Sequence, residues 1–215
     1  MASHVKTPRA YRSDRRVAQA ARTRAAVVAA ARDLFAGQGY AATTVAQVAA
    51  RAGVAADTVY AAVGRKPELI RETLETAISG TDTAVAAEDR GYVRAIRAAP
   101  NAEDKIAIYA AAVAEIAPRT APLHMALREA AAVDRACAGL AEELSERRAA
   151  NMLPFAANLR ATGSMRPALS DDDVAAIVWS MNAAEYYLLL ARRGWTAQRY
   201  GQFLADSWRR LLLSP

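Results

Sequence analysis

The feature that most constrains this chain is a pair of short apolar patterns separated by a turn, within residues 43–69. Apolar side chains recur at helical spacing in the first pattern, at Val45, Val48, Ala49 and Ala52. Thr44 and Gln47 form a capping box at its start, and Gly53 permits the left-handed backbone that ends it. After a short turn comes a second apolar set, made of Val59, Ala62 and Val63. Two short helices joined by about three or four residues with a turn glycine predict a helix-turn-helix.

An ordinary helical hairpin is the alternative, and the distribution of charge argues against it. Up to Arg71 the chain carries 12 Lys and Arg against 4 Asp and Glu, whereas the remainder carries 16 against 18. The positive charge crowds the N-terminus, at Lys6, Arg9, Arg12, Arg15, Arg16, Arg22 and Arg24. Such a basic arm is typical of proteins that contact DNA phosphates. We expect residues 1–17 to be a disordered arm in the free protein, either a solvated tail or one that gains order on DNA.

Helical patterns fill the chain and no alternating strand pattern occurs, so we expect an all-α fold of about nine or ten helices. A helix near 18–37 should pack on the helix-turn-helix and complete a three-helix DNA-binding domain over residues 18–65. The next helix, with Pro67 in its first turn, begins a larger domain over residues 66–215. Pro154 should kink or split one of its helices, and Ser170 should cap another. These helices are expected near 83–98, 102–117, 122–134, 137–162, 171–193 and 196–213.

Composition limits the classes to which the chain can belong. Its 215 residues, 53% of them hydrophobic, can bury a sizeable core. No run of about 20 apolar residues occurs, so we expect neither a membrane span nor a signal peptide and place the protein in the cytoplasm. The single cysteine, Cys137, excludes an internal disulfide and is expected to be a buried small hydrophobe rather than a reactive thiol. Phosphate-loop, metal-site and nucleophile-elbow motifs do not occur, which predicts no enzyme activity, metal or cofactor.

The last two predicted helices carry more apolar surface than one packed face requires. In 171–193 two stripes run side by side, Val174, Ile177, Val178, Met181, Leu188 and Leu189 in one, and Trp179, Ala183, Tyr186 and Leu190 in the other. The helix near 196–213 shows a similar excess. A second apolar face implies a partner, and for a DNA-reading chain we expect a second copy of itself and a four-helix interface. The alternative is that both stripes lie in the core of the monomer.

A series of motifs extends over residues 31–69. They are Leu34-Phe35, Gly39-Tyr40, Thr43-Thr44-Val45, Ala52-Gly53-Val54, Thr58-Val59-Tyr60 and Lys66-Pro67-Glu68-Leu69. This series resembles the TetR family of bacterial transcriptional regulators and covers the N-terminal third of the chain. The chain departs from the family pattern at Ala55, where a Ser or Thr cap is common, and at Val63, where Phe is common. Ala55 weakens the cap of the second helix, and Val63 places a smaller apolar side chain in its core.

The resemblance implies a homodimer, which we expect to be a repressor, that binds a palindromic operator in double-stranded DNA. Ligand binding in the C-terminal domain would move the helix after Gly64 and change the spacing of the two DNA-reading helices. Only a spacing of roughly 34–36 Å fits adjacent major grooves. The family places Tyr60 and Lys66 on phosphates, with Thr44 and Thr58 near the DNA backbone. Bases would be contacted by Ala56, Asp57 and Ala61, although Asp57 is equally suited to favouring the helix dipole.

The effector site is expected among polar and aromatic residues of the C-terminal helices. The main candidates are Asn151, Phe155, Trp179, Asn182, Glu185 and Tyr186, followed by His124, Glu129, Asn158 and Tyr187. Apolar bodies with polar tips suit a small hydrophobic or aromatic molecule, whose identity the sequence leaves open. Glu185 lies on an apolar stripe and needs a partner, which we expect to be Arg147 or Arg148 rather than a tyrosine hydroxyl or an amine of the ligand. A filled core and control by a protein partner form the alternative.

Overall fold

The computed structural model describes residues 8–215, and side chains from residue 14 onward. Within this part of the chain lie eleven α-helices and one short 3₁₀ helix, and the only strand-like pairing is a single bridge between Met165 and Leu213. The predicted all-α fold class is confirmed. The helices outnumber the nine or ten expected because two predicted helices are each divided, while two others are joined into one.

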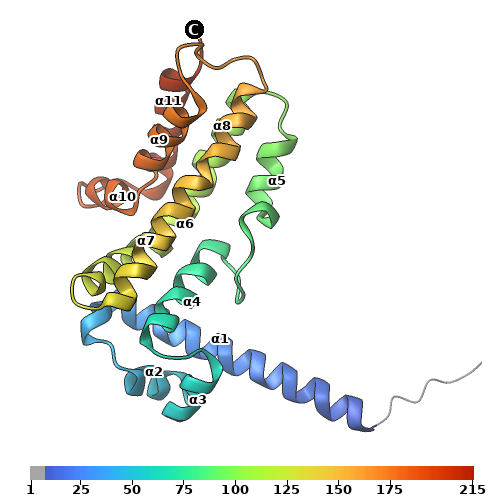
Figure 1. Ribbon diagram of the computed structural model, residues 1–215, viewed down its shortest axis with the longest axis vertical. Helices are drawn as coiled ribbons and strands as arrows, with labels where there is room; N and C mark the ends of the chain where they lie inside the picture. Colours follow the sequence, from blue (N-terminus) through green and yellow to red (C-terminus); the bar gives the residue numbers. More distant parts are fainter. Residues whose placement is uncertain (1–7) are drawn as a thin grey trace, which may run out of the picture.

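The N-terminal helices form one end of the molecule (Figure 1). The long α1 (Pro8–Ala42) crosses this end, and α2 (Val45–Ala52) and α3 (Ala56–Ala62) pack against it. The next helix, α4 (Lys66–Ser79), leads from this layer toward the remaining helices (Figure 1). The side chains in the shared core are almost completely buried, among them Val27, Phe35, Val48, Val59 and Leu69. The first helix therefore contacts α2 and α3 on one side and α4 on the other.

The first helix is longer than the one predicted near 18–37. It begins at Pro8, so residues 8–17 of the predicted arm continue it as helix, while residues 1–7 lie outside the described part. Near its other end, Gly39 leaves the helical conformation with φ 79° and ψ 175°, a backbone region that favours glycine. The behaviour of the arm on DNA stays a prediction.

The other helices surround α6 (Ala102–Ala131), which packs against α1, α4, α5 (Gly91–Ala98), α10 (Ala184–Ala191) and α11 (Ala197–Leu212). The remaining elements are a 3₁₀ turn (η1, Ala87–Asp89), α7 (Arg135–Ala150), α8 (Met152–Arg160) and α9 (Asp171–Met181). A helix was predicted near 83–98, and its first half was predicted wrongly, because the chain is non-helical up to η1. Large buried side chains between α6 and α11 include Ile106, Tyr200, Leu204 and Trp208.

Two helices predicted near 102–117 and 122–134 are in fact one. The central helix continues through Pro118 and Pro122, although neither proline can donate the backbone hydrogen bond one turn back. Thr120 uses its hydroxyl to donate to the Ile116 carbonyl at 3.0 Å. Helices pack along most of α6, and this packing outweighs the local cost of the prolines. The predicted boundary was wrong because the sequence pattern does not contain those neighbours.

The predicted helix over 137–162 is divided into α7 and α8 at Asn151, as Pro154 indicated. Pro154 has no N–H to donate to the Ala150 carbonyl, so the turn around Asn151 is weakened.

The predicted helix over 171–193 is divided as well, which the sequence did not indicate. The backbone is extended at Ala183, with φ −67° and ψ 148°, and the axes of α9 and α10 differ by 42°. The Tyr200 hydroxyl donates to the Met181 carbonyl at 2.6 Å and so satisfies an acceptor near the break. No single described helix is long and apolar enough to span a membrane, and the bent α9–α10 pair meets the criterion by length and composition only.

Candidate DNA interface and ligand cavity

The second helix of the chain is held in place by caps at both ends. The Thr44 hydroxyl accepts from the Gln47 backbone N–H at 3.2 Å, and the Gln47 side chain accepts from the Thr44 N–H at 2.8 Å. Gly53 ends α2 in the left-handed region with φ 69°. By contrast, Ala55 offers no side-chain cap to α3, as the departure from the family pattern predicted. Packing of Val59, which is fully buried, holds α3 instead.

One side of α3 is open to solvent. Tyr60 is 50% exposed, and Ala56, Asp57 and Ala61 are exposed as well, whereas Thr58 is half-buried. Residues four apart on a helix share a face. The structure therefore brings most of the predicted DNA-contacting residues of α3 into one strip. Their contact with DNA stays a prediction.

Lys66 borders the same shallow depression as Tyr60, between α3 and the start of α4. Its ammonium lies 4.0 Å from the centre of the Tyr40 ring, and desolvation lowers its pKa. The Tyr40 hydroxyl in turn donates to Asp134 at 3.4 Å, and Asp134 caps α7. Lys66 thus lies where the helix-turn-helix meets the second group of helices.

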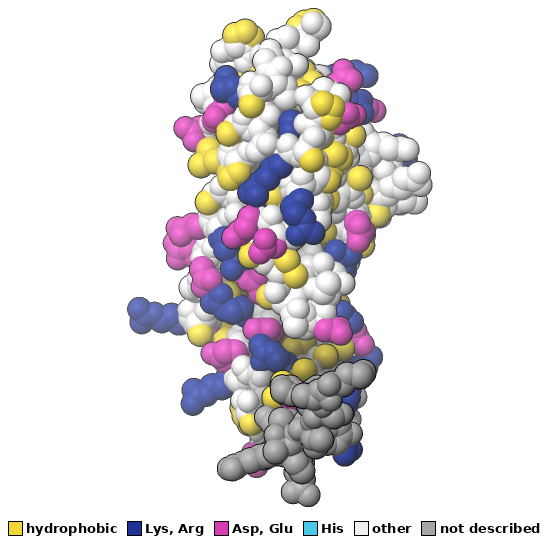
Figure 2. Space-filling view, turned by 90° about the vertical axis from the view of Figure 1, so that its right-hand side faces the viewer, with side chains coloured by type: hydrophobic (Ala, Val, Ile, Leu, Met, Phe, Trp, Pro, Cys, Tyr) yellow, Lys and Arg dark blue, Asp and Glu magenta, His cyan; other side chains and the backbone are white. Residues whose placement is uncertain are grey.

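The described basic residues are not all available to DNA. Arg24 donates to the Ala62 carbonyl and pairs with Glu72 at 2.8 Å, so it ties α1 to the end of α3 and to α4. On the face that carries α5, basic and acidic side chains are interspersed, with hydrophobic side chains between them (Figure 2). That mixed face does not resemble a phosphate-binding surface, whereas Asp57 is the one acidic residue within α3.

A cavity of about 460 Å³ lies between α5, α6, α7 and α8. Its volume falls in the range of small-molecule sites, roughly 300–1,000 Å³. One stripe of α6 lines it over four helical turns, at Tyr109, Val113, Ile116, Ala117, Thr120 and His124. The end of α4 also reaches it through Ile78, and exposed residues of η1, α5 and α8 lie at its mouth.

Four of the six main ligand candidates line this cavity: Asn151, Phe155, Asn182 and Glu185. So do His124 and Asn158, but Glu129 and Tyr187 do not. Trp179 and Tyr186 also lie outside it, because the break between α9 and α10 turns the two helices to different neighbours. The Arg148 guanidinium lies 4.8 Å from the centre of the Trp179 ring. Tyr186 stacks on Phe203, with ring centres 6.3 Å apart.

Tyr109 and Tyr92 line the cavity but were missed in the sequence. The rings of Tyr109 and Tyr92 stack with centres 6.1 Å apart, and Tyr109 lies 4.8 Å from Phe155. Asn182 donates to the Tyr109 hydroxyl at 3.0 Å, and burial raises the pKa of this phenol, so it stays protonated. The helical spacing from Tyr109 to His124, with polar residues at both ends of an apolar stripe, was the available signal.

Arg148 is a half-buried cation on the wall of the cavity. Its Nη1 donates to the Trp179 carbonyl at 2.7 Å and to the Asn182 side chain. No described carboxylate lies within ion-pair distance of it. Desolvation lowers its pKa from the ordinary arginine value. Glu185, for which Arg147 or Arg148 was the expected partner, pairs instead with Arg128 at 2.7 Å, because the turn at Ala183 carries it to the α6 side.

His124 is the other titratable group inside the cavity. Burial, and then the charge of Arg148, lower its pKa to about 4, so the imidazole is neutral at pH 7. No hydrogen-bond partner for it occurs in the described part of the chain, which leaves one donor and one acceptor facing the cavity. No group of His, Cys, Asp or Glu suited to a metal ion occurs among the described residues. Cys137 is buried and free, as predicted.

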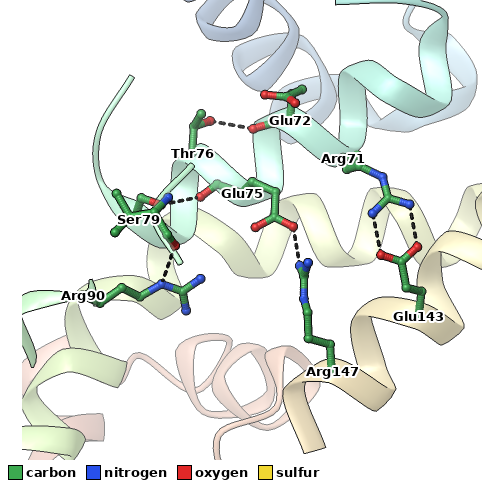
Figure 3. A network of polar contacts seen from close by, with 9 residues as sticks. Arg71, Glu72, Glu75, Thr76, Ser79, Arg90, Glu143 and Arg147 are labelled. Atoms are coloured by element: carbon green, nitrogen blue, oxygen red, sulfur yellow. Dashed lines mark hydrogen bonds and ion pairs between the residues drawn. The ribbon is translucent and has the colours of Figure 1, made fainter. Parts of the chain in front are cut away.

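The wall of the cavity is joined to α4 by two ion pairs (Figure 3). Arg71 of α4 donates twice to Glu143 of α7, at 2.6 Å in each bond. One turn further along both helices, Arg147 pairs with Glu75. Arg147 precedes the cavity residue Arg148, so the same turn of α7 faces α4 on one side and the cavity on the other.

Together, α1 to α4 make a helix-turn-helix DNA-binding domain, and the remaining helices make a second domain with a ligand-sized cavity. Residues 27–73 match the model of the family described as bacterial regulatory proteins, tetR family. No curated protein matches the sequence. Over these residues the chain therefore resembles the DNA-binding domain of the TetR-family transcriptional regulators, and the comparisons of structure agree with a shared fold.

Three solved structures share the fold. A TetR-family transcriptional regulator from Rhodococcus sp. has a TM-score of 0.67 at 16% identity, over 89% of this chain and 98% of that one. A transcriptional regulator from Saccharomonospora viridis in complex with choline has a TM-score of 0.68 at 15% identity, over 89% and 98%. The complex of SmeT with triclosan has a TM-score of 0.63 at 17% identity, over 89% and 92%. At these identities the likeness extends the fold assignment to the C-terminal helices.

Proposed function

We propose that this chain is a homodimeric repressor that binds a palindromic operator and leaves it when a small apolar or aromatic effector occupies the cavity. The observation that carries the proposal is the double role of α7. Its residues Leu144, Ser145 and Arg148 line the cavity, while Glu143 and Arg147 pair with α4. Since α4 follows α3 directly, a displacement of α7 by a ligand would reach the DNA-reading helix.

DNA contact is proposed for the exposed strip of α3 and for the residues around it. Ala56, Asp57 and Ala61 would face bases, and Tyr60 and Lys66 would bind phosphates. Thr44 at the start of α2 and Thr58 would lie near the DNA backbone. Support comes from the exposure of all these residues except the half-buried Thr58 and Lys66, and from the family match that covers them all.

A dimer is proposed through the C-terminal helices. The sequence AEYYLLLA of α10 is strongly apolar, yet none of its side chains is fully buried in the monomer, and Leu189 is 63% exposed. On α11, Leu211 is 47% exposed. An obligate interface resembles a divided core and buries well over roughly 1,000 Å². Pairing of α10 and α11 with a second copy would cover both leucines.

Ligand control is supported by the cavity and by two structurally similar proteins, which are complexes with choline and with triclosan. The test begins with selection of a binding site from a random duplex library, using the full chain. The expected result is a site with two-fold symmetry, bound by a dimer in sedimentation and repressing a reporter promoter. A monomer at micromolar concentration, or a selected site with no symmetry, would contradict the dimeric repressor.

The effector half of the proposal is tested separately. A library of small apolar and aromatic compounds is screened for shifts in melting temperature and for loss of operator binding in fluorescence anisotropy. Compounds that act on the wild-type chain should fail on a Phe155→Ala variant, whose cavity wall is altered. If no compound moves either quantity, control by a protein partner becomes the better account.

A further inference from the structure

Five arginines line the cavity, against two glutamates. The arginines are Arg90, Arg97, Arg128, Arg147 and Arg148, and the glutamates are Glu88 and Glu185. Two of these arginines already have carboxylate partners, since Arg128 pairs with Glu185 and Arg147 pairs with Glu75 outside the lining. An excess of positive charge in a partly enclosed space attracts anions and disfavours cations.

Within this set, Arg148 is half-buried, and its guanidinium contacts the polar side chain of Asn182. It has five N–H donors, of which only those of Nη1 have acceptors among the described residues. The Nε and Nη2 edge therefore retains its donors, and that edge matches the two oxygens of a carboxylate. Its other contact, with the Trp179 ring, holds the guanidinium by one face and leaves the edge unaffected.

The cavity around Arg148 is lined by both polar and apolar side chains. Close to Arg148 lie the amide of Asn182, which also binds Tyr109, and the neutral imidazole of His124. The lining also contains apolar side chains, at Val113, Ile116, Ala117, Leu127, Leu144 and Phe155. Such a site provides for one charged end and one apolar body.

We propose that the effector is an amphipathic acid, with its carboxylate held by the free edge of Arg148 and an aromatic or aliphatic body along the apolar wall. The inference rests on the proposed function, which makes this cavity the effector site, and it narrows the ligand from any apolar molecule to an organic anion. A volume of about 460 Å³ favours a compact body such as a phenylalkyl, naphthyl or medium aliphatic group.

The test compares matched compounds on the full chain by isothermal titration calorimetry. The probes are 4-phenylbutanoate, 2-naphthoate and octanoate, each with its primary amide and the corresponding amine. Hydrogen bonds to a charged group favour the acid over the isosteric amide by about ten- to a hundredfold. We expect this ratio for each body that binds, with the amine weakest. An amide or amine that binds as tightly as its acid, or no binding by any of the acids, would overturn the proposal.

Variants locate the selectivity. In Arg148→Gln the amide can still reach the Trp179 carbonyl, and the acid-to-amide ratio should fall close to one while the affinity of the amide stays within about twofold, as expected for loss of one charged contact. Arg148→Lys keeps the positive charge but lacks the paired N–H donors of the guanidinium edge, and it should give an intermediate acid-to-amide ratio. Arg135→Gln removes one positive charge from an exposed position on the same helix and should leave the ratio unchanged. A ratio that survives in Arg148→Gln would refute the assignment, and if that variant does not fold, Arg148→Lys and the wild-type series decide.

The two proposals fail in different ways. If acids bind selectively but leave operator affinity unchanged, the ligand class is right and the induction model is wrong. If neutral compounds bind the cavity and release DNA, the induction model stands and the acid proposal is wrong.

Discussion

The ion pair between Glu75 and Arg147 should be strongly asymmetric when its partners are removed one at a time. The Glu75 side chain is only 14% exposed, whereas that of Arg147 is 44% exposed. In Glu75→Gln, the freed arginine can turn its guanidinium into water. In Arg147→Gln, the carboxylate stays where α4 holds it, with little access to solvent, and the free energy of unfolding should fall much further.

The exposed fractions of the two side chains determine how far each substitution should lower the free energy of unfolding. Glu75→Gln removes a pair with one solvated partner, which corresponds to a loss of about 1 kcal/mol or less. Arg147→Gln leaves a mostly buried acceptor without its donor, for which the loss is about 1–3 kcal/mol. Arg71 lies four residues before Glu75 and retains some favourable charge interaction with it. We therefore expect the lower half of that range, about 1–2 kcal/mol.

Urea unfolding at one fixed protein concentration measures both changes, because the stability of the proposed dimer would depend on concentration. The double variant should be more stable than Arg147→Gln alone, since it no longer contains the unpaired carboxylate. Glu143→Gln is the matched control, in which the more exposed pair with Arg71 is broken. Equal losses from Glu75→Gln and Arg147→Gln, or a larger loss from Glu75→Gln, would show that burial does not govern this contact.

Four further outcomes are expected. Lys66→Ala should weaken binding to all DNA sequences alike and reduce the slope of log affinity against log salt by about 0.9, measured by anisotropy, and an unchanged slope would remove Lys66 from the interface. Leu189→Arg should give monomers in sedimentation that no longer bind the operator, whereas a dimeric variant would place the interface elsewhere. Gly201→Ala should lower the free energy of unfolding by about 1–3 kcal/mol, since its Cβ would lie 2.8 Å from a side chain of α6. The control Gly139→Ala, with nothing within 4 Å, should raise it by about 0.5–1 kcal/mol. Burial lowers the pKa of His124 from 6.5 to about 4, so the unfolded state binds the proton more readily, and stability should fall as pH drops between these values. His124→Gln should flatten that fall, and an identical pH profile in the variant would contradict the low pKa.

Features fixed by residues close together in sequence were predicted well. The capping box of Thr44 and Gln47 and the left-handed Gly53 place α2 by local hydrogen bonds and backbone preference, so the pattern alone is enough. The uncapped start of α3 followed from Ala55 in the same way. The helix boundary predicted at Pro118 and Pro122 was wrong for the converse reason. Their local cost is offset by helices that pack on α6 from distant parts of the chain, and the sequence pattern does not contain those contacts.

The same distinction explains the ligand candidates. Asn182 and Phe155 were chosen because their chemistry suits a pocket, and both line the cavity, although ligand binding by them stays a prediction. Trp179 was misplaced because one continuous helix was assumed, and the extended backbone at Ala183 changes which residues share a face. Arg148 was considered only as a partner of Glu185. Its role on the cavity wall depends on the Trp179 carbonyl and the Asn182 amide, which are brought to it by the break itself.

The break between α9 and α10 also indicates how an effector would shift the equilibrium away from the DNA-binding state. A shift from 99% to 1% of the DNA-binding state requires about 5.5 kcal/mol of differential affinity, or about 2.8 kcal/mol at each of two sites in a dimer. A charged hydrogen bond made in only one state contributes about 1.5–3 kcal/mol, which is close to the requirement for one site. Arg148 holds α7 to the α9–α10 break by its Nη1 contacts, while the neighbouring Arg147 holds α7 to α4. A carboxylate on the free edge of Arg148 would therefore act at the junction of the two contacts, and a small movement of α7 there changes the support of α4 without any rearrangement of the helix-turn-helix core.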